Sequence, residues 1–140
     1  MALSATTPRD WLTGFSELTL RYPVAASTQL YEGDVIASSS GYAGAAAGDG
    51  TDVVLGVCGE DTDNSAGAAG DKEVPVRAAG ALRVPVTGAS AVTDVNSAVY
   101  WNGSAFTLTS TDNTRVGTVL RWISSTTCLV YFFADTMVPA

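Results

Sequence analysis

The amino-acid sequence is made of short runs of valine, threonine and aromatic residues, each followed by a cluster of glycine, asparagine, aspartate or serine. Runs of this kind with turn signals between them are typical of strands in a β-sandwich or barrel. Helical signals gather only at Pro8–Phe15, where Thr7 is a candidate cap and Pro8 takes the first helical position. The sequence therefore predicts an all-β fold: a small compact β-sandwich or barrel-like domain with an extended N-terminal arm and Gly/Ala-rich loops.

The predicted strands cover most of the chain after residue 16, so residues 1–16 are expected to form the arm and residues 17–140 a single β-domain. The strands are Glu17–Arg21, Asp34–Ala37, Val53–Glu60, Glu73–Ala79, Gly80–Val86, Ala98–Trp101, Ala105–Thr109, Thr114–Ile123 and Thr127–Phe133. The last two flank Ser124–Thr126, which predicts a hairpin. Pro75 and Pro85 lie inside strand-like runs, and because proline cannot donate to a neighbouring strand, we expect these runs at sheet edges or bulges.

Two long loops are expected between the strands. Gly41–Thr51 is nearly all small residues and buries too little apolar area to fix itself, so it is predicted to be mobile or to be ordered only by a partner. Glu60–Lys72 collects four acids. The Asn102-Gly103 pair predicts a tight type I′ turn, with Tyr100 and Phe106 on one face of the hairpin and Trp101 on the other.

The charge balance excludes two classes of partner. The 140-residue chain has a formal charge of −7, and its six arginines are scattered and form no patch in sequence. An acidic surface repels phosphate backbones and anionic lipid, so we expect no nucleic-acid binding.

No run approaches the ~18 apolar residues of a membrane helix, and the start of the chain has neither a basic region nor an apolar signal core, so no membrane partner is expected.

Enzyme chemistry is poorly supported. The sequence has no histidine, the usual base and metal ligand. Among the acids of Glu60–Lys72, nothing in the spacing sets two carboxylates across a cleft. Asp61, Asp63 and Ser65 match the first three ligand positions of a calcium-binding loop. Ala66 and Lys72, however, replace the glycine and the glutamate of that pattern, so the alternative is a weak calcium site. We therefore predict no enzyme and no cofactor.

The cysteines and aromatics each allow two interpretations. Cys58 and Cys128 lie in apolar runs and are expected to be buried, unreactive thiols, with a disulfide between adjacent strands as the alternative. The aromatics lie mostly in strand-like runs, where packing in the core or between subunits is the default, and a platform for stacking sugars is the alternative. They are Tyr100, Trp101, Phe106, Trp122, Tyr131, Phe132 and Phe133.

The order of motifs is similar to that of a known family. The pieces are "YEGDVIASSSGYA" (Tyr31–Ala43), "DVVLGVCGEDTDNSAGAAGDKEVPVR" (Asp52–Arg77), "GALRVPV" (Gly80–Val86), "NSAVYW" (Asn96–Trp101) and "TRVGTVL" (Thr114–Leu120). In this succession, from about Leu18 to Phe133, the chain resembles the small head-decoration, or capsid cement, proteins of tailed bacteriophages. It departs from the family at Val95-Asn96-Ser97, where members commonly have a Gly-Asp pair.

The resemblance implies a structural role. Proteins of this family form compact β-domains, usually trimers, on the outside of the assembled head at three-fold or quasi-three-fold positions, where they lock capsid subunits together. It implies a homotrimer whose partner is the major capsid protein, located on the outer surface of the virion after assembly in the host cytoplasm. A head-surface module that binds host or environmental glycan is the alternative function.

The N-terminal segment suggests where contacts form. Trp11, Leu12, Phe15 and Leu18 precede the main β-pattern, and we expect this arm to reach a capsid subunit or a neighbouring copy, with strand addition as one route. An arm folded on its own domain is the alternative. Trp101 is a further candidate contact, either inside one subunit or against its neighbour.

Overall fold

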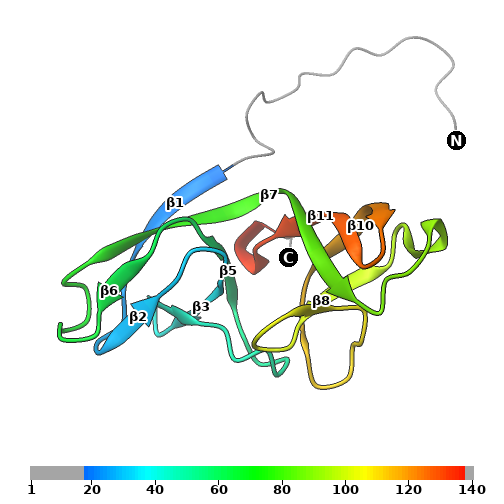
Figure 1. The fold of residues 1–140 in the computed structure, drawn as a ribbon. Coiled ribbons are helices and arrows are strands. Elements are labelled where there is room, and N and C mark those ends of the chain that lie inside the picture. The colour runs from blue at the N-terminus through cyan, green and yellow to red at the C-terminus, as the bar shows by residue number, and fades with distance from the viewer. Residues whose placement is uncertain (1–17, 138–140) are drawn as a thin grey trace, which may run out of the picture.

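The computed structural model describes residues 18–137, and this part of the chain is almost entirely β-structure (Figure 1). The strands are β1 (Leu18–Pro23), β2 (Thr28–Leu30), β3 (Val35–Ser39), β4 (Tyr42–Ala45), β5 (Val54–Cys58), β6 (Thr62–Asn64), β7 (Glu73–Thr87), β8 (Ala98–Trp101), β9 (Phe106–Thr107), β10 (Thr114–Ser124) and β11 (Thr127–Phe133). The described residues also form two short 3-10 helices, η1 (Val92–Asp94) and η2 (Asp135–Met137). The predicted all-β fold is confirmed.

Half of the molecule is a closed barrel. The C-terminal half of β7 pairs with β11, and the sheet continues through β10, β8 and β9 before it returns to β7. The closing pair, β7 with β9, is parallel at Val86 and Phe106, and the other pairs are antiparallel. Closure leaves no strand of this ring with an unpaired edge inside the sheet, which is how small barrels avoid edge-to-edge association.

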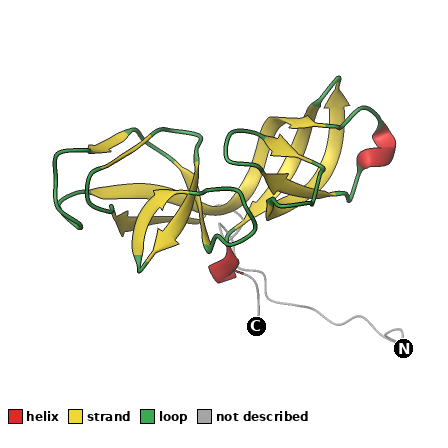
Figure 2. Cartoon of the chain, turned by 90° about the horizontal axis from the view of Figure 1, so that it is seen from below, coloured by secondary structure: helices red, strands yellow, loops and turns green. Residues whose placement is uncertain are grey.

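The other half uses the same long strand. The N-terminal half of β7 pairs with β1 on one side and with β5 on the other, and the sheet continues through β3 to β4. A separate two-stranded ribbon, β2 with β6, packs beside it. Figures 1 and 2 show the result as two groups of strands at opposite ends of the molecule, with β7 running through both.

Two apolar clusters fill these halves, and β3 and β5 lie between them. Val35 and Ala37 of β3 belong to the barrel cluster, whereas Ile36 belongs to the second cluster with Leu30 and Val76. All five residues of β5 are buried. A strand covered on both faces reads as a continuous apolar run rather than an alternating one, which explains the sequence VLGVC.

The structure corrects the prediction for β7. The two strands expected at Glu73–Ala79 and Gly80–Val86 are one continuous strand of 15 residues. Strand β7 as a whole has neighbours on both sides, but at Pro75 and Pro85 it is paired on one side only. Each proline lies where a neighbouring strand stops or starts: β5 ends at Cys58, opposite Val76, and β9 pairs only from Val86. The missing N–H groups therefore interrupt no ladder.

The prediction that Gly41–Thr51 is mobile, or ordered only by a partner, is also wrong, because contacts within the chain order this segment. Its first part is β4, which pairs with β3. The carboxylate of Asp52 then accepts the N–H groups of Ala47 and Gly48, at 3.0 and 2.8 Å, and the hydroxyl of Thr114 at 2.6 Å. One side chain thus fixes a stretch that has too few apolar atoms to pack. The strands β2, β4 and β6 were not predicted because their sequences, TQL, YAGA and TDN, are mostly small or polar and form no apolar run.

Gly56 of β5 provides a test of the double-sided packing. Its φ is +149°, and a Cβ there would overlap the carbonyl oxygen of Arg77 in β7. We expect Gly56→Ala to lower the free energy of unfolding by about 2 to 4 kcal/mol, because the backbones of β5 and β7 must separate. The matched control is Gly44→Ala in β4, where a Cβ meets nothing within 4 Å, with a change within about 0.5 kcal/mol. Urea unfolding followed by circular dichroism measures both, and equal effects would contradict the packing argument.

Candidate contact surfaces

The root of the N-terminal arm lies at an open strand edge. Trp11, Leu12 and Phe15 are outside the described residues, so their predicted contacts stay predictions. Leu18 is the first residue of β1, is half-buried, and lies opposite Ala79 of β7. Among the described strands β1 pairs only with β7, and its Leu20 side chain is 37% exposed. One edge of β1 is therefore available for addition of a further strand.

Trp101 packs inside its own subunit. Its side chain is 5% exposed, and its ring lies 5.0 Å from that of Phe106, the residue opposite it across the β8–β9 pair. Trp101 and Phe106 thus share a face, and the prediction that set Phe106 with Tyr100 was wrong. The predicted type I′ turn is also wrong, because Gly103 has a positive φ and Asn102 does not.

The structure of the loop between β8 and β9 explains why the type I′ turn does not form. It contains four residues, and the Asn102 side chain organises it: Oδ1 accepts the N–H groups of Ser104 and Ala105 at 3.0 and 2.8 Å. The N–H of Asn102 donates to the carbonyl of Ala105 at 3.1 Å. Asparagine acts here through its side chain rather than through the left-handed backbone that the Asn-Gly signal suggested.

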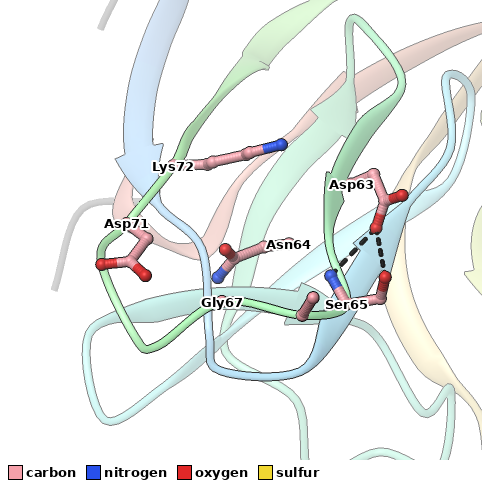
Figure 3. Close-up of a pocket in the computed structure, with 7 residues that line it drawn as sticks. Asp63, Asn64, Ser65, Gly67, Asp71 and Lys72 are labelled. Carbon is pink, nitrogen blue, oxygen red and sulfur yellow. Dashed lines mark hydrogen bonds between the residues drawn. The ribbon is translucent and has the colours of Figure 1, made fainter.

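The acidic loop between β6 and β7 borders a hollow of about 330 Å³ (Figure 3). Asp63 accepts the N–H and the hydroxyl of Ser65 at 2.9 and 2.5 Å, and Asp71 accepts the N–H of Ala68 at 2.8 Å. These carboxylates support their own loop. Within residues 18–137 no group of three or more His, Cys, Asp or Glu side chains is arranged to hold a metal ion.

Asn64 is the residue that fixes this loop, and no local sequence pattern marks its role. Its side chain is 1% exposed, and Nδ2 donates to the carbonyls of Ala25 and Ala68, each at 3.0 Å. Oδ1 lies against the Cα of Gly67, where a Cβ would overlap it. Because one buried amide links three segments of chain, the loop has a defined shape although it is mostly small residues.

Both cysteines and three of the seven aromatics are packed in the core. Cys58 and Cys128 are both buried and free, which confirms the expected thiols and not the alternative disulfide. Burial raises the pKa of each thiol, so neither is an activated nucleophile. Trp101, Phe106 and Phe132 are buried in the barrel and cannot stack on sugar. Tyr131, 36% exposed, lies on the outer surface of the barrel.

In the described residues the carboxylates of Asp52, Asp63 and Asp71 bind N–H groups of their own loops, and both thiols are buried. The comparison with known families identifies the class of protein: the family model for phage cement proteins matches residues 15–131. The chain therefore belongs to the phage cement protein family. It is a component of the phage virion and acts by binding the capsid. No curated protein matches the sequence. In the described residues no helix is long and apolar enough to cross a membrane.

The hydrogen-bonded carboxylates predict how stability depends on pH. The Ser65 hydroxyl and N–H lower the pKa of Asp63, and the N–H groups of Ser90 and Ala91 lower that of Asp94, below the ordinary 3.8. A lowered pKa in the folded state stabilises the fold above 3.8, and this contribution is lost as the pH falls through 3.8 toward the folded value. Burial raises the pKa of Asp34, which acts in the opposite direction.

We therefore expect the free energy of unfolding to decrease as the pH is lowered from about 5 to about 3, and to decrease less steeply in Asp63→Asn and Asp94→Asn. Asp112→Asn is the matched control, since Asp112 is an exposed turn residue with positive φ that asparagine also adopts. Urea unfolding at a series of pH values measures the slopes. Identical slopes in all three variants and the parent protein would contradict this assignment.

Proposed function

We propose that this protein is a homotrimeric decoration protein that binds the major capsid protein on the outside of the assembled phage head and stabilises the shell. The family match over residues 15–131 carries the proposal. The protein is made in the host cytoplasm and joins the head there. It has no substrate and no cofactor: the sequence lacks histidine, and burial raises the pKa of both thiols.

The mechanism is linkage between binding and shell stability. A ligand that binds only the assembled, expanded shell stabilises it by the free energy of binding. Three linked copies bind with a high effective concentration, so modest contacts in each subunit add up to slow release. A folded core that does not rearrange suits this role because little conformational entropy is lost on binding. The closed barrel and the doubly buried β5 supply such a core.

The arm is the proposed capsid contact. β1 leaves one edge free in the described part of the chain, and Trp11, Leu12 and Phe15 precede it in the sequence together with Leu18 at its start. We propose that residues 1–16 extend from this edge to a capsid subunit or a neighbouring copy. Large apolar side chains on an extended segment are the typical anchors of strand addition.

Electron microscopy of heads with and without the protein tests the location. We expect density for the protein at outer three-fold or quasi-three-fold positions, and heads that carry it to resist heating to a higher temperature than bare heads. Absence of the density from the outer surface would refute the proposed function. An intact outer density with no change in heat resistance would refute the stabilising role alone.

Deleting residues 1–16 tests the arm. We expect binding to expanded heads to weaken by about tenfold, equivalent to ~1.4 kcal/mol, because the apolar anchors are lost. Trp11→Ala with Phe15→Ala should reproduce most of the loss. Val92→Ser, which changes a side chain 68% exposed on η1, is the control and should bind as the parent does. Co-sedimentation with purified heads measures the affinities, and undiminished binding after the deletion would rule out the arm as a contact.

A further inference from the structure

We propose that the outer face of the barrel binds the acidic lobe of a second copy of this chain, so that the subunits join head to tail. The inference rests on the trimer of the proposed function and names the surfaces that build it. The arginine face consists of outward side chains of β7, β10 and β11: Arg83, Arg115, Arg121, Leu129, Tyr131 and Phe133. The acidic lobe is residues 24–73, which contain β2 to β6.

The strand register puts two arginines in one row. Leu129 of β11 lies directly opposite Arg83 of β7 on one side and Arg121 of β10 on the other. Residues in register across neighbouring strands project from the same face of a sheet. The two guanidinium groups therefore flank a leucine on the outside of the barrel. A hollow of about 290 Å³ lies between them, bordered also by Trp122 and Ile123.

The rest of the face is aromatic, with a third arginine. Tyr131 and Phe133 lie two residues apart on β11, with ring centroids separated by 6.0 Å. The guanidinium carbon of Arg115 lies 6.0 Å from the centroid of Phe133, and its Nη2 donates to the hydroxyl of Thr118 at 3.3 Å. Arginine and tyrosine are the side chains most enriched, with tryptophan, at the centre of protein interfaces.

The arginine face carries positive charge, and the strands that form it contain no acidic residue that would neutralise this charge. The residues from Ala79 to Thr87 of β7, and all of β8, β10 and β11, include these three arginines and no aspartate or glutamate. The whole chain has 14 acidic and seven basic residues, so this surface is opposite in sign to the molecule. In the part of the chain that the structure describes, the one salt bridge within 4.0 Å joins Arg21 to Glu73, outside the face. An acidic protein surface is the partner that this chemistry fits.

A second copy supplies such a surface. Residues 24–73 contain nine acidic residues and Lys72 as the only basic residue. Glu32, Asp34 and Asp61 gather around Cys58, whose thiol pKa they raise further after the effect of burial. The N–H of Glu32 donates to Asp61 at 2.7 Å, which holds two acidic turns together.

Most of the acidic lobe lies at the end of the molecule away from the barrel (Figures 1 and 2), although the segment around Asp52 contacts Thr114 of β10. Within the described residues none of the three arginines of the face forms a salt bridge, so the face has no acidic partner in its own subunit. Unlike surfaces on opposite halves form a heterologous interface, and such an interface closes into a ring when the rotation between subunits allows it. A three-membered ring with identical interfaces uses every arginine face and every acidic lobe.

Charge reversal on the face tests the inference. In the full chain we expect Arg83→Glu with Arg121→Glu to weaken self-association by at least about tenfold, seen as a shift from trimer to monomer mass by light scattering after size exclusion. The control is Val92→Glu with Thr111→Glu, which adds two negative charges at exposed residues outside both surfaces and should keep the trimer. Circular dichroism must show that both variants are folded. Raising the salt from about 0.05 to about 0.5 M should weaken the parent trimer as well.

Cross-linking identifies the occupant even if charge reversal damages folding. Arg121→Lys keeps the charge and adds an amine, and a carbodiimide then joins this amine to a carboxylate that it contacts. With a mixture of ¹⁴N- and ¹⁵N-labelled chains, we expect links between labels from position 121 to acids within residues 24–73. A parent protein that is monomeric, or links only within one chain or only to acids outside the lobe, would overturn the inference.

Head binding separates this inference from the proposed function. If the Arg83→Glu, Arg121→Glu variant keeps the trimer mass but no longer binds heads, the face contacts the capsid: the second-copy inference fails and the proposed function stands. If the variant is monomeric and binds heads more weakly than the parent, both stand. If the parent forms the predicted cross-links and yet never binds heads, the inference stands and the proposed function fails.

Discussion

The pairing of β7 is the constraint on which the rest of the structure depends. Its 15 residues run through both halves of the molecule and pair with β1 and β5 at one end and with β11 and β9 at the other. Neither half is complete without it, since it closes the barrel and also provides the central strand of the second sheet. The two halves are therefore fixed to each other by main-chain hydrogen bonds and do not depend on a hinge or a linker.

The packing follows from this pairing. Because β7 brings the two halves together, β3 and β5 are enclosed between two apolar clusters, and small branched side chains such as Val35, Val54 and Val57 fill the space on the barrel side. A chain rich in valine and alanine and poor in leucine can fill thin layers of this kind. Large side chains are needed mainly inside the barrel, where Trp101, Phe106 and Phe132 lie.

The sequence predicted the class of fold and most strands, because alternating valine-rich runs and turn residues are local signals. The β10–β11 hairpin is an example, with its turn at Ser124–Thr126 as expected. The sequence did not predict the side-chain hydrogen bonds that join segments far apart along the chain. Asp52 orders the Gly41–Thr51 segment through Thr114, and Asn64 shapes the acidic loop through Ala25 and Ala68. Both side chains look like ordinary loop residues until the fold brings their partners near. The arginine face could not be predicted from the sequence for the same reason. Its residues Arg83, Arg115 and Arg121 are far apart in sequence and share one face only because of the register of β7, β10 and β11.

The continuous β7 also has a mechanical consequence. If the capsid subunits that a cement protein binds move apart, the protein is placed under tension. If the two ends of this molecule are pulled apart along β7, the hydrogen bonds to its antiparallel neighbours β1 and β11 are loaded in shear, many at once, rather than opened one after another as in peeling. A single strand shared by both halves thus makes the molecule strongest in the direction in which its ends are separated.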